Sequence, residues 1–372
     1  MEYLKLSDCA EYRSSRTKQI DFETYITTDN MLPDRAGITL VESLPDTKTV
    51  SKYLPKDILL SNIRPYFKKI WIANREGGCS NDVLVIKAKS NIYPEFLYYV
   101  LSDNNFFNYD TVTSKGTKMP RGTPSAIMKY LVPNFDKEQQ QKIVSILSNY
   151  DNLIEINNKR IKVLEQMAEN LYKEWFVRFR FPGYQTTEFE NGIPKGWAIY
   201  KISDIATIKA GGDRPDVFSD TPTEECHIPI FSNGLDEDGL YGYTDKAVIE
   251  NESVTISARG TVGFVCFRRK PYVPIVRLVA VIPKTKTVTP LYLYYYLQRD
   301  SIIANGTSQQ QITVPMVSRK RMIIPPASLL QAFDKHEYPI LNLTDKLKAQ
   351  NEALIQQRDL LLPRLMSGKL EV

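Results

Sequence analysis

Arginine, lysine, asparagine, glutamine and hydroxyl side chains gather in short glycine- and proline-containing loops between apolar runs. Arg can read guanine edges and Asn or Gln adenine edges in the DNA major groove, whereas Lys, Ser and Thr hold phosphates. A single loop of this kind is usually a solvated turn, but here similar loops recur at matching places in the two halves of the chain. The pattern therefore indicates DNA binding. The candidate DNA-binding residues are Arg13, Arg16, Asn62, Arg64, Tyr66, Lys68, Lys69, Lys115, Thr117, Lys118 and Arg121 in the first half, and Arg214, Ser232, Asn233, Arg259, Thr261, Thr307, Gln309, Gln310 and Gln311 in the second.

The common catalytic motifs are missing from the sequence. There is no Gly-x4-Gly-Lys-Ser/Thr phosphate loop, no Gly-x-Gly-x-x-Gly fingerprint and no Asn-Pro-Pro-aromatic tetrapeptide of adenine methyltransferases. The two histidines have no further ligands at metal spacing, and the four cysteines form no CxxC pair. We expect a chain that is not an enzyme and that holds no metal or cofactor of its own.

Composition places the chain among globular proteins. Its 372 residues are 42% hydrophobic and 24% charged, which is enough for two or three domains. The net charge of +5 suits an acidic polymer as partner, although a soluble enzyme could carry the same charge. No apolar run approaches the roughly 18 residues of a membrane span, and the first residues lack a signal-peptide core. We expect a cytoplasmic protein without a membrane partner.

Four landmarks occur twice in the same order, which indicates an internal duplication. The pairs are residues 5–10 with 201–206, 94–101 with 290–297, 115–118 with 305–308, and 130–133 with 322–325. In each half, β-branched and aromatic runs separated by turn residues predict strands. These runs are residues 57–61, 69–73 and 82–86 in the first half, and 253–257, 263–267 and 278–282 in the second. A short Leu/Tyr-rich helix follows the strands in each half, at residues 94–101 and 290–297.

A heptad stripe over residues 136–175 predicts one long helix whose apolar seam must meet another helix. Asp136 and Gln139 supply a capping box at its start, and Pro182-Gly183 stops the chain beyond its end. At 1.5 Å per residue this helix would be about 57 Å long, which corresponds to about 17 base pairs of DNA. The seam residues proposed for helix pairing are Ile143, Leu147, Ile154, Asn157, Ile161, Leu164 and Leu171.

The second half ends in the expected partner of this helix. It should begin at Ser328 with a capping box to Gln331, break at Pro339, and resume a heptad pattern over residues 340–365. Its seam positions are Leu343, Leu347, Leu354 and Leu361, with Gln350 and Gln357 in polar slots. The symmetry of a tandem duplication favours antiparallel packing. Asn157 is then either a tolerated polar seam residue or a pin that selects one helix register.

Together these elements predict an α+β fold. Two tandem-repeated mixed α/β domains are joined and separated by two long helices that pack as an antiparallel coiled coil. The expected segments are a first domain at residues 1–135, a central long helix at 136–181, a second domain at 182–326 and a distal helix at 327–372.

The chain resembles the specificity subunit of type I restriction–modification enzymes. The likeness spans nearly the whole chain, although no one motif is decisive. It lies in residues 57–66, 78–85, 171–176, 192–197, 259–263 and 358–365. One departure is that residues 2–6 lead straight into the repeat, without an Ile-Pro-x-Gly-Trp segment before them.

The resemblance implies two target-recognition domains that read a bipartite, asymmetric sequence in double-stranded DNA. It also implies that the chain has no catalytic activity and positions two modification subunits, which bind S-adenosylmethionine and methylate adenine, and two motor–nuclease restriction subunits. The helices would be the spacer and the docking surface for the modification subunits. An alternative is a coiled-coil assembly scaffold with two ligand-binding heads for a partner other than nucleic acid. A free-standing adenine methyltransferase is disfavoured by the missing motifs.

Overall fold

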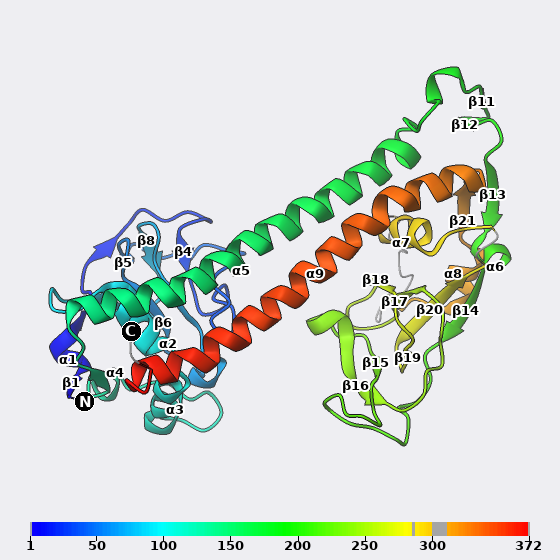
Figure 1. Cartoon of the computed structure of the whole chain (residues 1–372). Helices are drawn as coiled ribbons and strands as arrows, with labels where there is room; N and C mark the ends of the chain where they lie inside the picture. The colour runs from blue at the N-terminus through cyan, green and yellow to red at the C-terminus, as the bar shows by residue number, and fades with distance from the viewer. Residues whose placement is uncertain (1, 285–286, 300–310, 371–372) are drawn as a thin grey trace. The chain divides into compact units, whose positions relative to one another are not determined.

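The computed structural model describes residues 2–284, 287–299 and 311–370 (Figure 1). The chain divides into two compact units. The first contains Met1–Lys159 together with Leu347–Val372, and the second contains Arg160–Lys346. Each of the two long helices contributes one end to each unit.

In the first unit, a four-stranded sheet in the order β2-β9-β6-β7 carries the main core. Its strands are β2 (Ala10–Tyr12), β9 (Val83–Ala88), β6 (Ile58–Ser61) and β7 (Ile70–Ile72). A second sheet has the order β3-β5-β8-β4, with β3 (Arg16–Thr17), β5 (Val50–Tyr53), β8 (Gly77–Cys79) and β4 (Tyr25–Ile26). The remaining elements are β1 (Tyr3–Lys5), which pairs with β10 (Leu131–Pro133), and the helices α1 (Leu6–Cys9), η1 (Pro65–Phe67), α2 (Pro94–Ser102), α3 (Asn104–Thr113) and α4 (Pro124–Ile127).

The second unit repeats this plan with a sheet in the order β14-β20-β17-β18. Its strands are β14 (Ala206–Ala210), β20 (Leu278–Pro283), β17 (Ser253–Ser257) and β18 (Val265–Arg268). A smaller sheet contains β16 (Leu240–Thr244), β15 (Ile228–Phe231) and β19 (Val273–Pro274), and β13 (Ala198–Lys201) pairs with β21 (Arg321–Ile324). The remaining elements are β11 (Phe189–Glu190), β12 (Ile193–Pro194), η3 (Tyr184–Thr186), η4 (Asp236–Gly239), α6 (Ile202–Ile205), α7 (Pro290–Arg299) and α8 (Val314–Arg319).

The shared sheet order confirms the tandem duplication and the α+β fold class. The two units also share individual hydrogen bonds. The Lys5 backbone N–H donates to the Asp8 carboxylate at 3.1 Å, and the Lys201 N–H donates to Asp204 at 3.2 Å. Each bond satisfies a backbone donor at the start of a four-residue helix, α1 or α6, so the same local sequence produces the same turn twice.

The predicted central helix is α5 (Lys137–Tyr172), followed by a π-helical turn, η2 (Lys173–Val177). The predicted capping box is present, since the Gln139 N–H donates to Asp136 Oδ1 at 2.8 Å and the Asp136 N–H donates to Gln139 Oε1 at 3.3 Å. Of the predicted seam residues, Ile143, Leu147 and Ile161 are buried. Ile154, Leu164 and Leu171 are partly buried.

The predicted break at Pro339 was wrong, because α9 (Ala327–Met366) runs through it as one helix. A proline inside a helix removes one backbone hydrogen bond and costs about 3 kcal/mol. Buried side chains hold the helix on both sides of this proline. Glu337 is fully buried before it and Thr344 is 4% exposed after it. The packing of these flanking turns therefore opposes the break.

The seam of α9 also differs from the prediction. Leu343 is 38% exposed, and Thr344 is buried in its place. Gln350 and Gln357 are exposed, whereas Asn351 is buried. The buried polar position of the seam is therefore Asn351, one residue further along the helix than the predicted Gln350. Leu347 is buried, and Leu354 and Leu361 are partly buried.

Within the first unit the two helices run antiparallel (Figure 1), as predicted. Asn157 of α5 contacts Asn351 of α9, and Asp151, almost two turns earlier, contacts Arg358, two turns later. Asn157 Nδ2 donates to Asn351 Oδ1 at 2.9 Å and to Gln350 Oε1 at 3.1 Å, and Asn351 Nδ2 donates to Asn158 Oδ1 at 2.8 Å. This buried amide pair selects one register of α5 against α9, because a shift of either helix would leave buried amides without partners.

An Asn157→Leu variant is expected to lose about 1–3 kcal/mol of unfolding free energy, because the buried Asn351 amide keeps its desolvation cost without its partner. The double variant Asn157→Leu with Asn351→Leu should recover most of that loss. Urea unfolding of the two variants and the wild type measures the difference. A single variant as stable as the wild type would show that Asn157 is only a tolerated seam residue.

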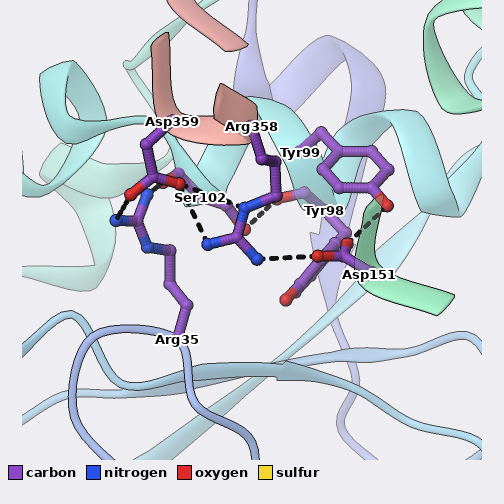
Figure 2. Close-up of polar contacts among 7 residues, drawn as sticks. All are labelled: Arg35, Tyr98, Tyr99, Ser102, Asp151, Arg358 and Asp359. Carbon is purple, nitrogen blue, oxygen red and sulfur yellow. Dashed lines mark hydrogen bonds and ion pairs between the residues drawn. The ribbon is translucent and has the colours of Figure 1, made fainter. Parts of the chain in front are cut away.

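A cluster of charged side chains ties α9 to the rest of the first unit (Figure 2). The Arg358 guanidinium donates to Asp151 Oδ1 at 2.7 Å and to Asp359 Oδ1 at 2.9 Å. On its other side Asp151 accepts from the Tyr99 hydroxyl of α2 at 2.7 Å. Arg35 donates to Asp359 at 2.7 Å and to the Ser102 carbonyl at 2.9 Å. The cluster therefore joins α2, α5, α9 and the loop that carries Arg35.

In the second unit, the matching tyrosine of α7 also meets a carboxylate. The Tyr295 hydroxyl donates to Glu337 Oε2 at 3.0 Å, and Glu337 is fully buried. Its Oε1 has no hydrogen-bond partner among the described residues. Burial raises the pKa of Glu337 to about 7. The folded unit therefore binds a proton at Glu337 more tightly than the unfolded chain does.

A Glu337→Gln variant is expected to be more stable than the wild type above pH 7, by about 2–3 kcal/mol. The folded pKa lies above the unfolded one, so the stability that protonated Glu337 contributes is lost as pH rises from about 4.5 to about 7. Gln cannot ionise and keeps this contribution at every pH. Thermal unfolding of both proteins at pH values below and above this window measures the effect. An equal stability difference at both pH values would contradict the assignment.

Candidate nucleic-acid interface

The loops that follow β6 and β17 occupy the same place in the two repeats. In the first unit, the Asn62 carbonyl accepts from the Gly122 N–H at 3.0 Å, and the Asn62 N–H donates to the Asp82 carbonyl at 2.8 Å. In the second, the Ala258 carbonyl accepts from the Ile312 N–H at 2.9 Å, and the Ala258 N–H donates to the Arg277 carbonyl at 2.7 Å. We call this set of backbone hydrogen bonds the loop frame. It holds different side chains in the same arrangement in each unit.

In the first unit the loop frame brings Arg64 and Arg121 together. The Arg64 N–H donates to the Pro120 carbonyl at 2.8 Å. Lys115 and Arg121 exchange two backbone hydrogen bonds of 2.9 Å each, which closes the loop between them. Arg121 also forms an ion pair with Asp82 at 2.7 Å. The predicted residues Lys115, Thr117, Lys118 and Arg121 are all exposed on this loop.

Aromatic side chains stand beside these cations. Tyr66 and Phe67 in η1 are 47% and 39% exposed. The Arg64 guanidinium lies 6.0 Å from the Phe67 ring centroid. Arg64 has a φ of 49°, which is unusual for a residue with a side chain. Exposed rings next to cations suit the stacking of bases and the binding of phosphates.

In the second unit the loop frame joins three predicted segments. Asn233 Nδ2 donates to the Arg259 carbonyl at 2.8 Å, and Thr261 Oγ1 donates to the Asn233 carbonyl at 2.5 Å. Arg259 donates to Gln311 Oε1 at 2.6 Å. Gly260, between them, has a φ of 76°, and a Cβ atom there would lie 2.7 Å from Asn233 Nδ2. Only glycine fits this turn without displacing Asn233. Ser232, the remaining predicted residue of these loops, is partly buried next to Asn233.

Some predicted residues have other partners. Arg13 forms a two-bond ion pair with the buried Asp57, at 2.5 and 2.8 Å, so its guanidinium stabilises the first unit and is not available to DNA. Arg16 donates to Thr49, the residue just before the neighbouring strand β5. Lys69 donates to the Thr28 carbonyl at 2.6 Å, and burial lowers its pKa. Lys68 is partly buried, and Arg214 stands 4.7 Å from the Phe218 ring centroid.

Three of the predicted residues, Thr307, Gln309 and Gln310, lie outside the described residues.

The structure adds Arg277 to the candidate DNA-binding residues. It was not among the residues predicted from the sequence. It is the loop-frame counterpart of Asp82 and is exposed, next to the Arg259 loop. Its φ of 74° is strained for a residue with a side chain. The signal that could have identified it is the repeat itself, because Asp82 and Arg277 each immediately precede the equivalent strands β9 and β20.

The described part of the chain shows no sign of a metal centre or a membrane span. No group of three or more His, Cys, Asp or Glu side chains there could hold a metal ion. No helix among the described residues is long and apolar enough to cross a membrane. The four cysteines are buried free thiols.

Comparisons with known proteins point to one family. The family model described as the type I restriction modification DNA specificity domain matches residues 5–166 and again residues 194–357. The type I restriction enzyme MjaIX specificity subunit of Methanocaldococcus jannaschii is 27% identical over 348 residues, covering 86% of this chain and 79% of the relative. The HindI specificity subunit of Haemophilus influenzae is 25% identical and covers 98% of this chain and 100% of the relative.

The fold is also similar to that of a solved structure. The crystal structure of a type I restriction–modification system S subunit from M. genitalium aligns with a TM-score of 0.60 and 12% sequence identity. The alignment covers 98% of this chain and 96% of that one. The two matches of the family model divide the chain as the internal repeat does, one in each half.

Proposed function

Because this chain belongs to the family of the type I restriction modification DNA specificity domain, we propose that it reads a bipartite DNA target for a type I restriction–modification complex. The observation that supports this is the loop frame, which occurs once in each unit. It carries Arg64 and Arg121 in the first unit, and Arg259 and Gln311 in the second. Unlike side chains on equivalent frames suit two unequal half-sites in one duplex.

The chemistry of these side chains fits base edges and phosphates. A guanidinium can bind guanine O6 and N7 through two hydrogen bonds, and a Gln amide can do the same with adenine N6 and N7. The exposed lysines of the loop closed by Lys115 and Arg121 suit phosphates, which position the protein without reading sequence. We assign base reading to the arginines and Gln311, and backbone binding to Lys115 and Lys118.

In this proposal the chain selects the site and other subunits carry out the chemistry. Two modification subunits would bind S-adenosylmethionine and methylate adenine, and two restriction subunits would supply the motor and nuclease. The sequence carries no motif of these catalytic sites, and the described residues form no cluster for a metal. The expected role of this chain is to present both half-sites to the modification subunits.

Mapping methylated adenines in cells with and without this gene tests the proposal. We expect methylation at a two-part sequence that disappears when this chain is removed and returns when it is restored. Methylation of DNA by the isolated chain, without any partner, would contradict the proposed division of labour.

A salt titration separates DNA reading from the alternative of a scaffold for a partner other than nucleic acid. Binding through six to ten phosphates should weaken by roughly 10³–10⁵-fold between about 50 and 200 mM salt. A scaffold with an apolar interface should show little change. Salt-independent affinity without preference for the mapped sequence would favour the scaffold.

A further inference from the structure

Asp110 is a buried carboxylate of the first unit whose side chain has no partner among the described residues. It is on α3 and is fully buried. Neither of its carboxylate oxygens has a hydrogen-bond partner among the described residues. A buried carboxylate that is ionised and unpaired is costly, so this group favours its neutral form.

Asn62, which belongs to the loop frame, faces the same space. Its Oδ1 is buried and has no partner among the described residues. Gly122 lies between the two side chains. A Cβ atom on Gly122 would lie 2.6 Å from Asp110 Oδ1 and 2.8 Å from Asn62 Oδ1. Two unpaired oxygens therefore converge where Gly122 leaves room for them.

The second unit provides an internal comparison. At the same positions of its loop frame it has Ala258 and Ile312, which are 6% and 1% exposed. The frame is thus compatible with apolar side chains at this place. The polar side chains of the first unit are not needed to form the frame, and buried polar groups carry a cost that apolar ones do not.

We propose that Asp110 is a positioning residue for the Asn62 amide: its neutral carboxyl donates a hydrogen bond to Asn62 Oδ1, which turns the Nδ2 donors of Asn62 outward. This inference rests on the proposed function. With Oδ1 engaged below, Asn62 offers only donors to the DNA. It then favours a base edge that presents an acceptor, such as purine N7, guanine O6 or thymine O4.

The surroundings of Asp110 agree with a neutral carboxyl. Burial raises its pKa to about 7, and no neighbouring charge contributes to the shift. From β2, Tyr12 faces it, and the Tyr12 hydroxyl donates to the Pro124 carbonyl at 3.0 Å. From the loop, Arg121 is paired with Asp82. Neither group supplies Asp110 with a counter-charge.

The hydrogen bond between Asp110 and Asn62 makes reading of the first half-site depend on pH. Above about pH 7, Asp110 ionises and its carboxylate can no longer donate to Asn62 Oδ1. The two oxygens then repel each other, and the amide loses its fixed orientation. In the second unit Ala258 takes the place of Asn62 in the loop frame, so no amide is held there in this way and reading of the second half-site should not change.

The test uses the full chain with its modification subunits and three duplexes: the mapped target, one with a scrambled first half-site and one with a scrambled second half-site. Affinity ratios are measured about one unit below and one unit above pH 7 for the wild type, Asp110→Asn and Asp110→Leu. Asn keeps a donor at every pH, whereas Leu has none. In the wild type, we expect discrimination at the first half-site to fall on the order of tenfold as pH rises.

The Asn variant should discriminate at both pH values, and the Leu variant at neither. Discrimination at the second half-site should stay unchanged in all three proteins, which shows that the second unit is folded and bound to DNA, and the Asn variant controls for a folded first unit. First-half discrimination that is independent of pH and equal in all three proteins would overturn the inference. So would discrimination that is lost on lowering the pH, because the ionised carboxylate would then be the partner of Nδ2.

Failure of the proposed function gives a different result. A wild-type complex without preference for either half-site would reject DNA reading by this chain. The acid–amide pair is then still tested in the free protein by an NMR titration of the Asp110 carboxyl and the Asn62 side-chain amide. A carboxyl that titrates near pH 7 together with the Asn62 amide signals supports the pair. Independent titrations, or a carboxyl ionised throughout, would overturn it.

Discussion

Replacing Arg358 with alanine is expected to cost about 3–5 kcal/mol of unfolding free energy. The Arg358 side chain is 14% exposed and binds two carboxylates, Asp151 on α5 and Asp359 on its own helix. Without the guanidinium, the Tyr99 hydroxyl is the partner that Asp151 keeps among the described residues, and the charge of Asp151 stays partly buried. Removing one partner of a buried ion pair is more destabilising than the pair itself is stabilising.

The matched control is Arg269→Ala in the second unit. Arg269 also joins a domain loop to α9, where it binds Asp345 and Asn342. Asp345 is 60% exposed and the second carboxylate, Glu252, lies 3.9 Å away, so the loss of Arg269 should cost only about 1 kcal/mol. Chemical denaturation of both variants and the wild type gives the comparison. Equal losses for Arg358→Ala and Arg269→Ala would show that the cluster in Figure 2 contributes no more than a surface ion pair.

The second large effect is expected for DNA reading by Arg259. An Arg259→Ala variant should bind the mapped duplex about 1–3 kcal/mol more weakly and lose discrimination within the second half-site. The guanidinium is exposed and already oriented by Gln311, and its loop is held by Asn233. A preoriented arginine loses little conformational freedom on binding guanine, which is why its removal should be costly.

The same Arg269→Ala variant serves as the control for binding, because it removes an arginine of the same unit that lies outside the loop frame. Equilibrium titrations with the target and with each scrambled half-site separate the two effects. Arg64→Ala should instead lose discrimination only within the first half-site. If Arg259→Ala weakens binding equally for all duplexes, Arg259 contacts phosphate and not a base.

Local patterns predicted the elements well because their causes are local. The capping box at Asp136 and the strand at residues 253–257 depend on neighbours a few residues away. The course of α9 through Pro339 depends instead on Glu337 and Thr344, whose burial comes from distant parts of the chain. The polar seam position was missed by one residue because Gln350 and Asn351 are both polar and both accept from Asn157, and only their burial in the folded chain distinguishes them.

The residue types of the candidate site could be predicted from the sequence. The partners and burial of its side chains could be predicted much less well. The exposure of Arg64, Arg121 and Arg259 could be predicted because each arginine stands in a turn between strands, and their role in DNA binding stays a prediction. Arg13 was assigned to DNA because its partner Asp57 is 44 residues away and cannot be recognised from spacing. Arg277 could have been found by aligning the two repeats at Asp82, whereas its strained backbone and the missing partner of Asp110 are seen only in the folded chain.

The division of the chain also bears on the order in which it folds during translation. The second unit is a single continuous segment, Arg160–Lys346, whereas the first needs Leu347–Val372 in addition to Met1–Lys159. Domains usually fold in the order of their synthesis. Here the earlier-made half cannot complete its core until the segment that follows the second unit has been synthesised, because Leu362 and Leu365 belong to that core. The nascent first unit therefore exposes part of its core while the whole second unit is being made.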